Sequence, residues 1–297
     1  MSDNELITMF ESHLRDEKKA SKNTLDSYIR DIRQLSEYLS LNTSHNLSSA
    51  SDKDIDGYIE ILRNSGKSVA TVSRSIASIK NFYMQLCIKQ VITTSPANGL
   101  KPDKPVEKIP EILTSEEIDL LLQQPKCIDA KGYRDRAMLQ LMYATGMRVS
   151  ELLELNINDL NLDAKVVKCS SGKKERLIPM YPAAIKALSD YITLVRPQMI
   201  ANSDEQALFV NVTGERMSRQ GFWKIIKYYT HSAGIEKDIT PQTLRHSFAT
   251  HLLENGADMQ SIQELMGFSD ISSAHVYSKV VKSRLKEIYN KAHPYAK

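Results

Sequence analysis

Cysteine is scarce in this chain, and the few cysteines are poorly placed for pairing or for metal binding. Cys87, Cys127 and Cys169 are odd in number, lie far apart and form no CxxC pair. A disulfide framework needs paired cysteines, and a structural zinc site needs clustered thiolate or imidazole ligands. We therefore expect neither a disulfide framework nor a metal site.

Long apolar runs and a strong excess of charge are also missing. No segment approaches the roughly 20 apolar residues of a membrane span, and the opening MSDNELITMF lacks a signal-peptide pattern. These absences predict a cytoplasmic protein with no membrane partner. The net charge of +3 permits a nucleic-acid partner without requiring one, since the distribution of the 39 Lys and Arg residues decides that point.

What the chain does contain is length and helical periodicity. Its 297 residues are too many for one small core, so we expect two domains. Residues 1–90 predict a bundle of four amphipathic helices, because apolar residues recur there at helical spacing. Capping boxes at Ser2 and Ser51 mark where two of these helices begin.

A change of composition marks the boundary between the domains. Residues 91–111 hold four of the ten prolines, which disfavours helix and predicts an extended linker. Residues 112–297 then open with a capping box at Thr114 and are mostly helical, with one predicted β-hairpin in AKVVKCSSGKKERLIPM. The expected fold class is mainly α (α+β): a helical bundle followed by a mostly helical domain with a small antiparallel hairpin or sheet.

The polar faces of the second and fourth predicted helices carry four cations among small hydroxyl and amide residues: Arg30, Arg33, Arg74 and Lys80. That mixture suits phosphate contacts and predicts a DNA-binding surface. An ordinary solvated helix face has the same composition, so the pattern alone leaves both interpretations open.

Three places in the second domain could support chemistry. Arg148 follows Gly146 where a helix begins, with Glu151 one turn later. An arginine and free backbone N–H groups at a helix N-terminus form an anion site, although a structural Arg–Glu pair fits equally well. Arg245 lies near a second helix start in TPQTLRHSFATHLL, and Tyr277 lies near the C-terminus, where a tyrosine usually packs. Each of these residues is ambiguous by itself.

Taken in order, however, these segments resemble a known family. Six segments are similar, in this order, to the catalytic domain of the tyrosine recombinases of the phage integrase family: ATGMRVSELLEL, KKERLIP, GERMSRQGFWKIIK, TLRHSFATHLLENGAD, IQELMG and VYSKV. NTLDSYIRDIRQLSEYL and SVATVSRSIASIKNFY resemble the core-binding domain that precedes it. The resemblance covers nearly the whole chain and is closest to the Xer type, which resolves chromosome dimers.

The resemblance implies a mechanism. Tyr277 attacks a DNA phosphodiester, which leaves a 3′-phosphotyrosyl link and a free 5′-hydroxyl, and a partner strand then reverses the step. Arg148 and Arg245 clamp the non-bridging oxygens, because guanidinium binds phosphate bidentately and stays charged. Glu151 orients Arg148. Since the covalent intermediate conserves the bond energy, neither ATP nor a metal cofactor is expected.

The sequence departs from the family pattern at three active-site positions. Gln242 stands where the first histidine is usual, and Phe268 replaces the histidine or tryptophan after the glycine of LMG. The lysine of the hairpin turn is Lys173 if the turn is shifted, Ser171 if it is aligned without a gap, and Lys174 is a further candidate. His246 and His251 belong to RHSFATH itself and do not fill the vacant histidine position.

These departures leave three hypotheses open. The first is an active, slow site-specific recombinase in chromosome segregation at cell division or in mobile-element integration. The second is a catalytically impaired DNA-binding paralogue with an architectural or regulatory role. The third is a nicking and closing activity of the type IB topoisomerase kind. A slow enzyme is reasonable because one lost proton-transfer group costs about 10²–10⁴ in rate.

The resemblance also implies partners. It leads us to expect a clamp around double-stranded DNA, and a homo-tetramer or a hetero-tetramer with a second recombinase on two DNA sites. A C-terminal helix with Leu285 and Ile288 is expected to dock on a neighbour. A DNA translocase is a further expected activator. The compact length favours the chromosomal role over the mobile-element role.

Overall fold

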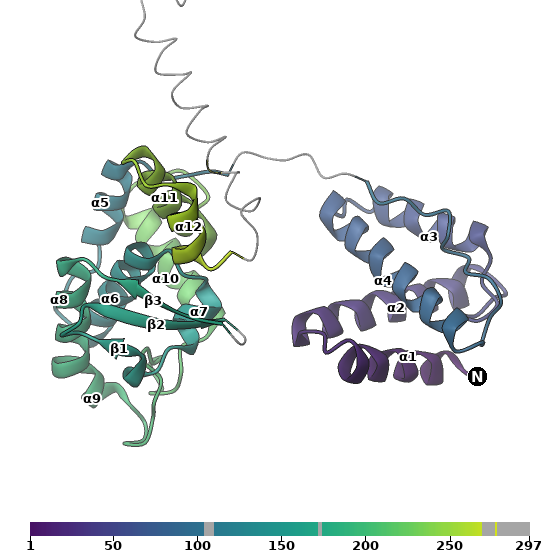
Figure 1. The fold of residues 1–297 in the computed structure, drawn as a ribbon, viewed down its shortest axis with the longest axis horizontal. Helices are drawn as coiled ribbons and strands as arrows, with labels where there is room; N and C mark the ends of the chain where they lie inside the picture. The colour runs from purple at the N-terminus through teal and green to yellow at the C-terminus, as the bar shows by residue number, and fades with distance from the viewer. Residues whose placement is uncertain (104–109, 172–173, 269–276, 278–297) are drawn as a thin grey trace, which may run out of the picture. The chain divides into compact units, whose positions relative to one another are not determined.

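The computed structural model describes residues 1–103, 110–171, 174–268 and Tyr277. The chain divides into two compact units, residues 1–107 and 108–297 (Figure 1). Each unit has its own apolar core. None of the helices within the described residues is both long and apolar enough to cross a membrane.

The first unit is a bundle of four helices, of which the first continues into a π-helical turn at His13–Glu17. The helices are α1 Asp3–Ser12, α2 Lys22–Asn42, α3 Asp52–Asn64 and α4 Val69–Ile88. Each begins after a serine whose side chain accepts from a backbone N–H one turn later, which satisfies a donor that the helix itself cannot pair. Phe10 and Phe82 meet edge to face at the centre, with ring centroids 5.3 Å apart.

The chain after α4 stays with this bundle as far as the structure describes it. Ala97 is fully buried and Leu100 is almost so, and both belong to the apolar core of the first unit. Arg63 on α3 holds Asp103 through two hydrogen bonds of 3.0 and 3.2 Å. Part of the proline-rich stretch is therefore packed against α3 and α4.

The second unit is mostly helical, with one small sheet (Figure 1). Its longer helices are α5 Ser115–Gln123, α6 Ala130–Thr145, α8 Pro182–Asp190, α10 Arg219–Ser232 and α11 Pro241–Glu254. Shorter helical segments are α7 Val149–Glu154, Ile157–Asp159, Tyr191–Val195, α9 Arg196–Met199 and α12 Met259–Met266. Helix α6 is buried on nearly all sides, as expected for a helix that the others surround.

The sheet consists of three antiparallel strands in the order β1–β2–β3, namely Leu160–Asn161, Val166–Ser171 and Lys174–Pro179. Ser171 pairs with Lys174, so two residues separate β2 from β3. The predicted fold class and the predicted hairpin are confirmed, while the short strand β1 is an addition that the sequence pattern did not reveal. Strand β3 contacts α12 and so brings the hairpin to the candidate site.

Candidate active site

Arg148 is positioned by a sharp turn between α6 and α7. Gly146 ends α6 in the left-handed conformation, at φ 56°, where glycine is favoured. A Cβ atom at this position would lie 2.2 Å from the ring of Phe248, so the turn also depends on the missing side chain. The chain then places Arg148 at the N-cap of α7.

Glu151 is the acceptor around which the site is organised. Its carboxylate receives the backbone N–H of Arg148 at 2.7 Å and Nη1 of the same residue at 3.1 Å. Arg176 on β3 donates to both carboxylate oxygens, at 3.0 and 2.9 Å. Burial by itself would raise the pKa of Glu151, but the hydrogen bonds from Arg176 and Arg148 lower the pKa below its ordinary value. Glu151 is therefore an ionised carboxylate.

Arg245 is the most deeply buried cation in the described part of the site, with 1% of its surface exposed. One end of its guanidinium donates to the carbonyl of Gly146. Burial and the nearby Arg148 lower the pKa of Arg245 to about 10, which leaves it positively charged near neutral pH. The guanidinium also lies over the ring of Phe268, 5.0 Å from its centroid. Phe268 therefore supports Arg245 from one side.

The C-terminal end of α12 is where three arginines meet. Arg176 donates to the carbonyl of Leu265 at 2.8 Å and Arg245 to that of Met266 at 2.7 Å. Arg148 donates to the carbonyl of Gly267 at 3.3 Å. The last carbonyls of a helix have no partner within it and carry partial negative charge, so cations suit this end. Three successive carbonyl oxygens thus hold Arg148 and Arg245, which the sequence associated with phosphate, and Arg176, which it did not.

Tyr277 lies beside this cluster and is almost completely buried. Its hydroxyl is 3.1 Å from Nδ1 of His246, and its ring centroid is 6.1 Å from that of Phe268. Burial raises the pKa of Tyr277, while Arg245 and Arg148 act in the opposite direction. Burial and Arg245 lower the pKa of His246 to about 4, so the imidazole is neutral at pH 7. The hydroxyl therefore meets an uncharged ring nitrogen next to a buried cation.

His251, the other histidine of the same helix, has a different location. Its Nδ1 is 2.8 Å from the hydroxyl of Tyr143, and its Nε2 is 3.0 Å from the carbonyl of Leu113. His251 thus helps to attach the beginning of the second unit to α11. Gln242 is exposed on the first turn of α11, one turn before Arg245.

The hairpin lysine is described only in part. Lys173 lies outside the described residues. Lys174 opens β3, two positions before Arg176, and strand alternation places both on the same face of the sheet. Within the described residues, no group of three or more His, Cys, Asp or Glu side chains is arranged to hold a metal ion.

The candidate DNA-binding cations of the first unit fall into two groups. Arg30 and Arg33 are exposed on α2, whereas Arg74 on α4 donates to Asp31 and to the carbonyl of Ser27. Ser78 also donates to Asp31, which is 2% exposed. Arg74 therefore already has a structural role between α2 and α4.

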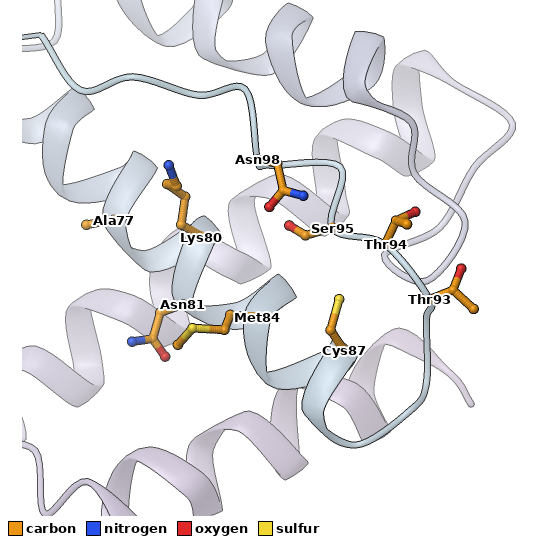
Figure 2. Close-up of a pocket in the computed structure, with 9 residues that line it drawn as sticks. All are labelled: Ala77, Lys80, Asn81, Met84, Cys87, Thr93, Thr94, Ser95 and Asn98. Atoms are coloured by element: carbon orange, nitrogen blue, oxygen red, sulfur yellow. The ribbon is translucent and has the colours of Figure 1, made fainter.

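Lys80 borders a groove of about 540 Å³ between α4 and the segment that follows it (Figure 2). Its ammonium donates to the carbonyl of Leu100 at 3.0 Å. Helix α4 contributes Ala77, Asn81, Met84 and Cys87 to the groove, and the segment after it contributes the polar residues Thr93, Thr94, Ser95 and Asn98. Lys80 thus keeps an exposed side chain while helping to hold the connecting segment.

Sequence reasoning overlooked two residues of the site. Arg176 lies in the KKERLIP motif, and strand alternation from Lys174 could have identified it as a side chain on the same face. His246 was regarded only as part of RHSFATH. Its contact with Tyr277 joins residues 31 positions apart, and no local pattern predicts such a pair.

Two family models match the chain. The one described as the phage integrase, N-terminal SAM-like domain matches residues 7–90, and the one described as the phage integrase family matches residues 111–284. The tyrosine recombinase XerD of Oceanobacillus iheyensis is 46% identical over 296 residues, which are 98% of each chain.

Solved structures of recombinases have a similar fold. The XerA recombinase is 26% identical with a TM-score of 0.55, over 98% of this chain and 99% of that one. The XerH site-specific recombinase bound to palindromic difH substrate, in a post-cleavage complex, has a TM-score of 0.76 at 20% identity. That match covers 96% of this chain and 84% of the XerH chain and shows a shared fold.

Proposed function

Because this chain belongs to the phage integrase family, as an Xer-type tyrosine recombinase, we propose that it cuts and rejoins duplex DNA at specific sites through Tyr277. The observation that supports this role for Tyr277 is its position. The hydroxyl lies against neutral His246 and within the field of Arg245 and Arg148. A nucleophile, a nearby base and two cations are thus assembled in one small region.

The proposed step forms one bond and breaks another at phosphorus. Tyr277 Oη attacks the phosphorus, the bond from phosphorus to the 5′-oxygen breaks, and a 3′-phosphotyrosyl link remains. Neutral His246 accepts the phenolic proton at Nδ1, and the hairpin lysine, Lys173 or Lys174, protonates the leaving 5′-oxygen. The 5′-hydroxyl of a partner strand reverses the same step.

Arg148 and Arg245 are the proposed phosphate clamp. In the DNA-free protein they donate to Gly267 and Met266, whose carbonyl oxygens are acceptors like the non-bridging oxygens of phosphate. A phosphate that replaces these carbonyls receives the same guanidinium groups without a large rearrangement. Arg148 is better placed to make this change, because its side chain is 38% exposed.

Gln242 and Phe268 slow this chemistry in our proposal without abolishing it. Gln242 offers an amide donor to phosphate but cannot titrate near neutral pH. Phe268 donates no hydrogen bond, yet it packs under Arg245 and beside Tyr277. Since these contacts keep the nucleophile and the cations together, nothing observed favours the catalytically impaired paralogue.

We propose double-stranded DNA as the substrate, with Arg30 and Arg33, which are exposed on α2, as phosphate contacts of the first unit. XerH, a site-specific recombinase that shares the fold, is bound to palindromic difH substrate in its solved complex. By analogy we also propose assembly as a tetramer on two DNA sites, from this chain alone or with a second recombinase. Activation by a DNA translocase belongs to the same proposal.

Covalent trapping tests the proposed function. The protein is incubated with a nicked suicide duplex that carries a candidate recombination site, and SDS-resistant protein–DNA adducts are measured. We expect adducts with the wild type and with Tyr228→Phe, which changes an exposed tyrosine of α10, and none with Tyr277→Phe. Adducts that persist in Tyr277→Phe contradict the assignment of the nucleophile.

The double variant Gln242→His, Phe268→His distinguishes a slow enzyme from an impaired one. We expect it to form adducts faster than the wild type. If only the double variant forms adducts, the native protein is a DNA binder that has lost catalysis at these two positions.

A further inference from the structure

Arg176 uses all three nitrogens of its guanidinium inside the site. Nη1 and Nη2 donate to the two oxygens of Glu151 at 3.0 and 2.9 Å, and Nε donates to the carbonyl of Leu265 at 2.8 Å. The side chain is 14% exposed. One residue of β3 therefore joins α7 to the end of α12.

Gly267 makes room for this arrangement. A Cβ atom at Gly267 would lie 2.8 Å from Nη1 of Arg176, in a backbone conformation that side chains rarely adopt, at φ 64°. The glycine thus lets Arg176 lie against the end of α12 while its own carbonyl accepts from Arg148. The two arginines are held on carbonyls two residues apart, those of Leu265 and Gly267, and on the same carboxylate.

Charge balance gives Arg176 a role beyond packing. Glu151 is 5% exposed and negatively charged, so its attraction for any adjacent cation is only weakly screened. Arg176 forms two hydrogen bonds with the carboxylate, whereas the Arg148 side chain forms one. With both arginines present, the three side chains carry a net single positive charge. Without Arg176, the carboxylate would neutralise Arg148.

We infer that Arg176 is a positioning residue for strand cleavage, which binds Glu151 so that Arg148 keeps its charge and its geometry for the scissile phosphate. The inference rests on the proposed function, because it assigns Arg148 to the phosphate. Arg176 itself touches no reacting atom in this scheme. It acts through Glu151 and through the position of the α12 C-terminus.

Single-turnover cleavage on the suicide duplex tests this role. We expect Arg176→Met to lower the rate of adduct formation about ten- to a hundredfold, by analogy with the groups that orient metal ligands in metalloenzymes. The DNA dissociation constant should stay within about twofold, because Arg176 makes no proposed DNA contact. Arg176→Lys should fall between the wild type and Arg176→Met, since lysine retains the charge and loses the fork.

The decisive variant is the double substitution Arg176→Met, Glu151→Gln. If Arg176 acts by binding the carboxylate of Glu151, then Glu151→Gln removes the negative charge that would otherwise offset the charge of Arg148. The double variant should therefore cleave faster than Arg176→Met. Arg216→Met is the matched control. Arg216 donates to the carbonyls of Leu153 and Leu155 at the other end of α7 and does not contact Glu151.

The pH dependence gives a second measure. The charged or titratable groups that face Glu151 are Arg148 on α7, Arg176 on β3, Cys169 on β2 and Arg245 on α11. Arg176 lowers the pKa of Glu151, so Glu151 becomes neutral at a higher pH in Arg176→Met than in the wild type. A neutral Glu151 no longer neutralises Arg148, so the cleavage rate of Arg176→Met relative to the wild type should rise toward acidic pH. Glu151→Gln in the same background should remove that pH-dependent rise, because no carboxylate remains to titrate.

The outcomes separate this inference from the proposed function. A wild type without any Tyr277-dependent adduct contradicts the function itself. A normal wild type overturns the inference if Arg176→Met cleaves at the wild-type rate. The inference is equally overturned if the double variant is no faster than Arg176→Met, or if Arg216→Met shows the same loss of rate as Arg176→Met.

Discussion

The hydroxyl of Tyr277 and Nδ1 of His246 are 3.1 Å apart, and both groups are adjacent to the buried charge of Arg245. This pair links the two groups that exchange a proton in the proposed reaction. It also gives the protein a pH-dependent stability that can be measured without DNA.

His246 should make the protein less stable in acid. The pKa of His246 is lowered from 6.5 to about 4 in the folded state, so the unfolded state binds more protons between these values. The stabilising contribution is therefore complete above pH 6.5 and is lost as the pH falls toward 4. At most about 3 kcal/mol of unfolding free energy should be lost by pH 4, at 1.36 kcal/mol per pKa unit.

The measurement is urea unfolding of the wild type and of His246→Gln across this pH range. The variant has no imidazole to titrate, so its unfolding free energy should decline less steeply between pH 6.5 and 4. Parallel pH profiles for the two proteins would show that His246 is not buried as described.

Arg148→Lys should slow cleavage about 10²–10³-fold, as the loss of a transition-state donor does in other enzymes. Lysine keeps the charge but cannot bind phosphate and Glu151 with one planar fork. Single-turnover adduct formation on the suicide duplex gives the rate, and Arg136→Lys, on the exposed side of α6, is the control. Equal rates for the two variants would remove Arg148 from the phosphate site.

Gly146→Ala should destabilise the second unit and impair cleavage together. The new methyl group would meet the Phe248 ring at 2.2 Å, at a positive φ. Gly234→Ala is a matched control, because Gly234 also has a positive φ, of 68°, but no atom within 4 Å of the added Cβ. The difference between the two unfolding free energies should be about 1–3 kcal/mol, the usual cost of overpacking. Equal values would mean that the Phe248 ring moves aside freely.

Arg30→Ala and Arg33→Ala should weaken binding to all duplex sequences and reduce the salt dependence of binding by about one unit of log–log slope each. Both side chains are exposed on α2. Fluorescence anisotropy across a salt series measures this, with Arg15→Ala as a control, since Arg15 is exposed and already paired with Glu11. Unchanged slopes would remove both residues from the DNA interface.

Arg74→Ala should act mainly on stability. It leaves the carboxylate of Asp31, which is 2% exposed, with Ser78 as its remaining side-chain partner. Asp31 is buried but the Arg74 side chain is 36% exposed, so we expect a loss of about 1–3 kcal/mol, the usual cost of depriving a buried acceptor of a partner. Thermal unfolding should show a lower midpoint for Arg74→Ala than for Arg30→Ala. A midpoint equal to that of the wild type would show that the contact between Arg74 and Asp31 does not stabilise the first unit.

Local signals in the sequence predicted much of the fold. The capping boxes at Ser2, Ser51 and Thr114 are present as expected, because each depends only on residues within one turn. The hairpin is likewise a local feature. Helix α6 has little amphipathic pattern, since it is buried on nearly all sides, and its central location followed only from the structure.

The candidate site was predictable in its residue types but not in its contacts. Arg148 and Glu151 are neighbours on one helix, so their pairing is visible in the sequence. Arg176 and Glu151 are 25 positions apart, and their contact depends on how β3 packs against α7. The packing of the segment around Ala97 and Leu100 was likewise not predictable from the sequence. Prolines predict extended backbone, but they do not predict the surface against which that backbone lies.

The three successive carbonyls of α12 have a consequence for the direction of the reaction. In the proposed reaction DNA does not meet vacant arginines. Its phosphate replaces the carbonyls of Gly267 and Met266 on Arg148 and Arg245, while Arg176 keeps the carbonyl of Leu265. The free energy of engagement is then a small difference between two comparable sets of hydrogen bonds. Such a balance lets the clamp release the phosphate as readily as it takes it up, which is what an enzyme needs when its substrates and products are the same kind of molecule.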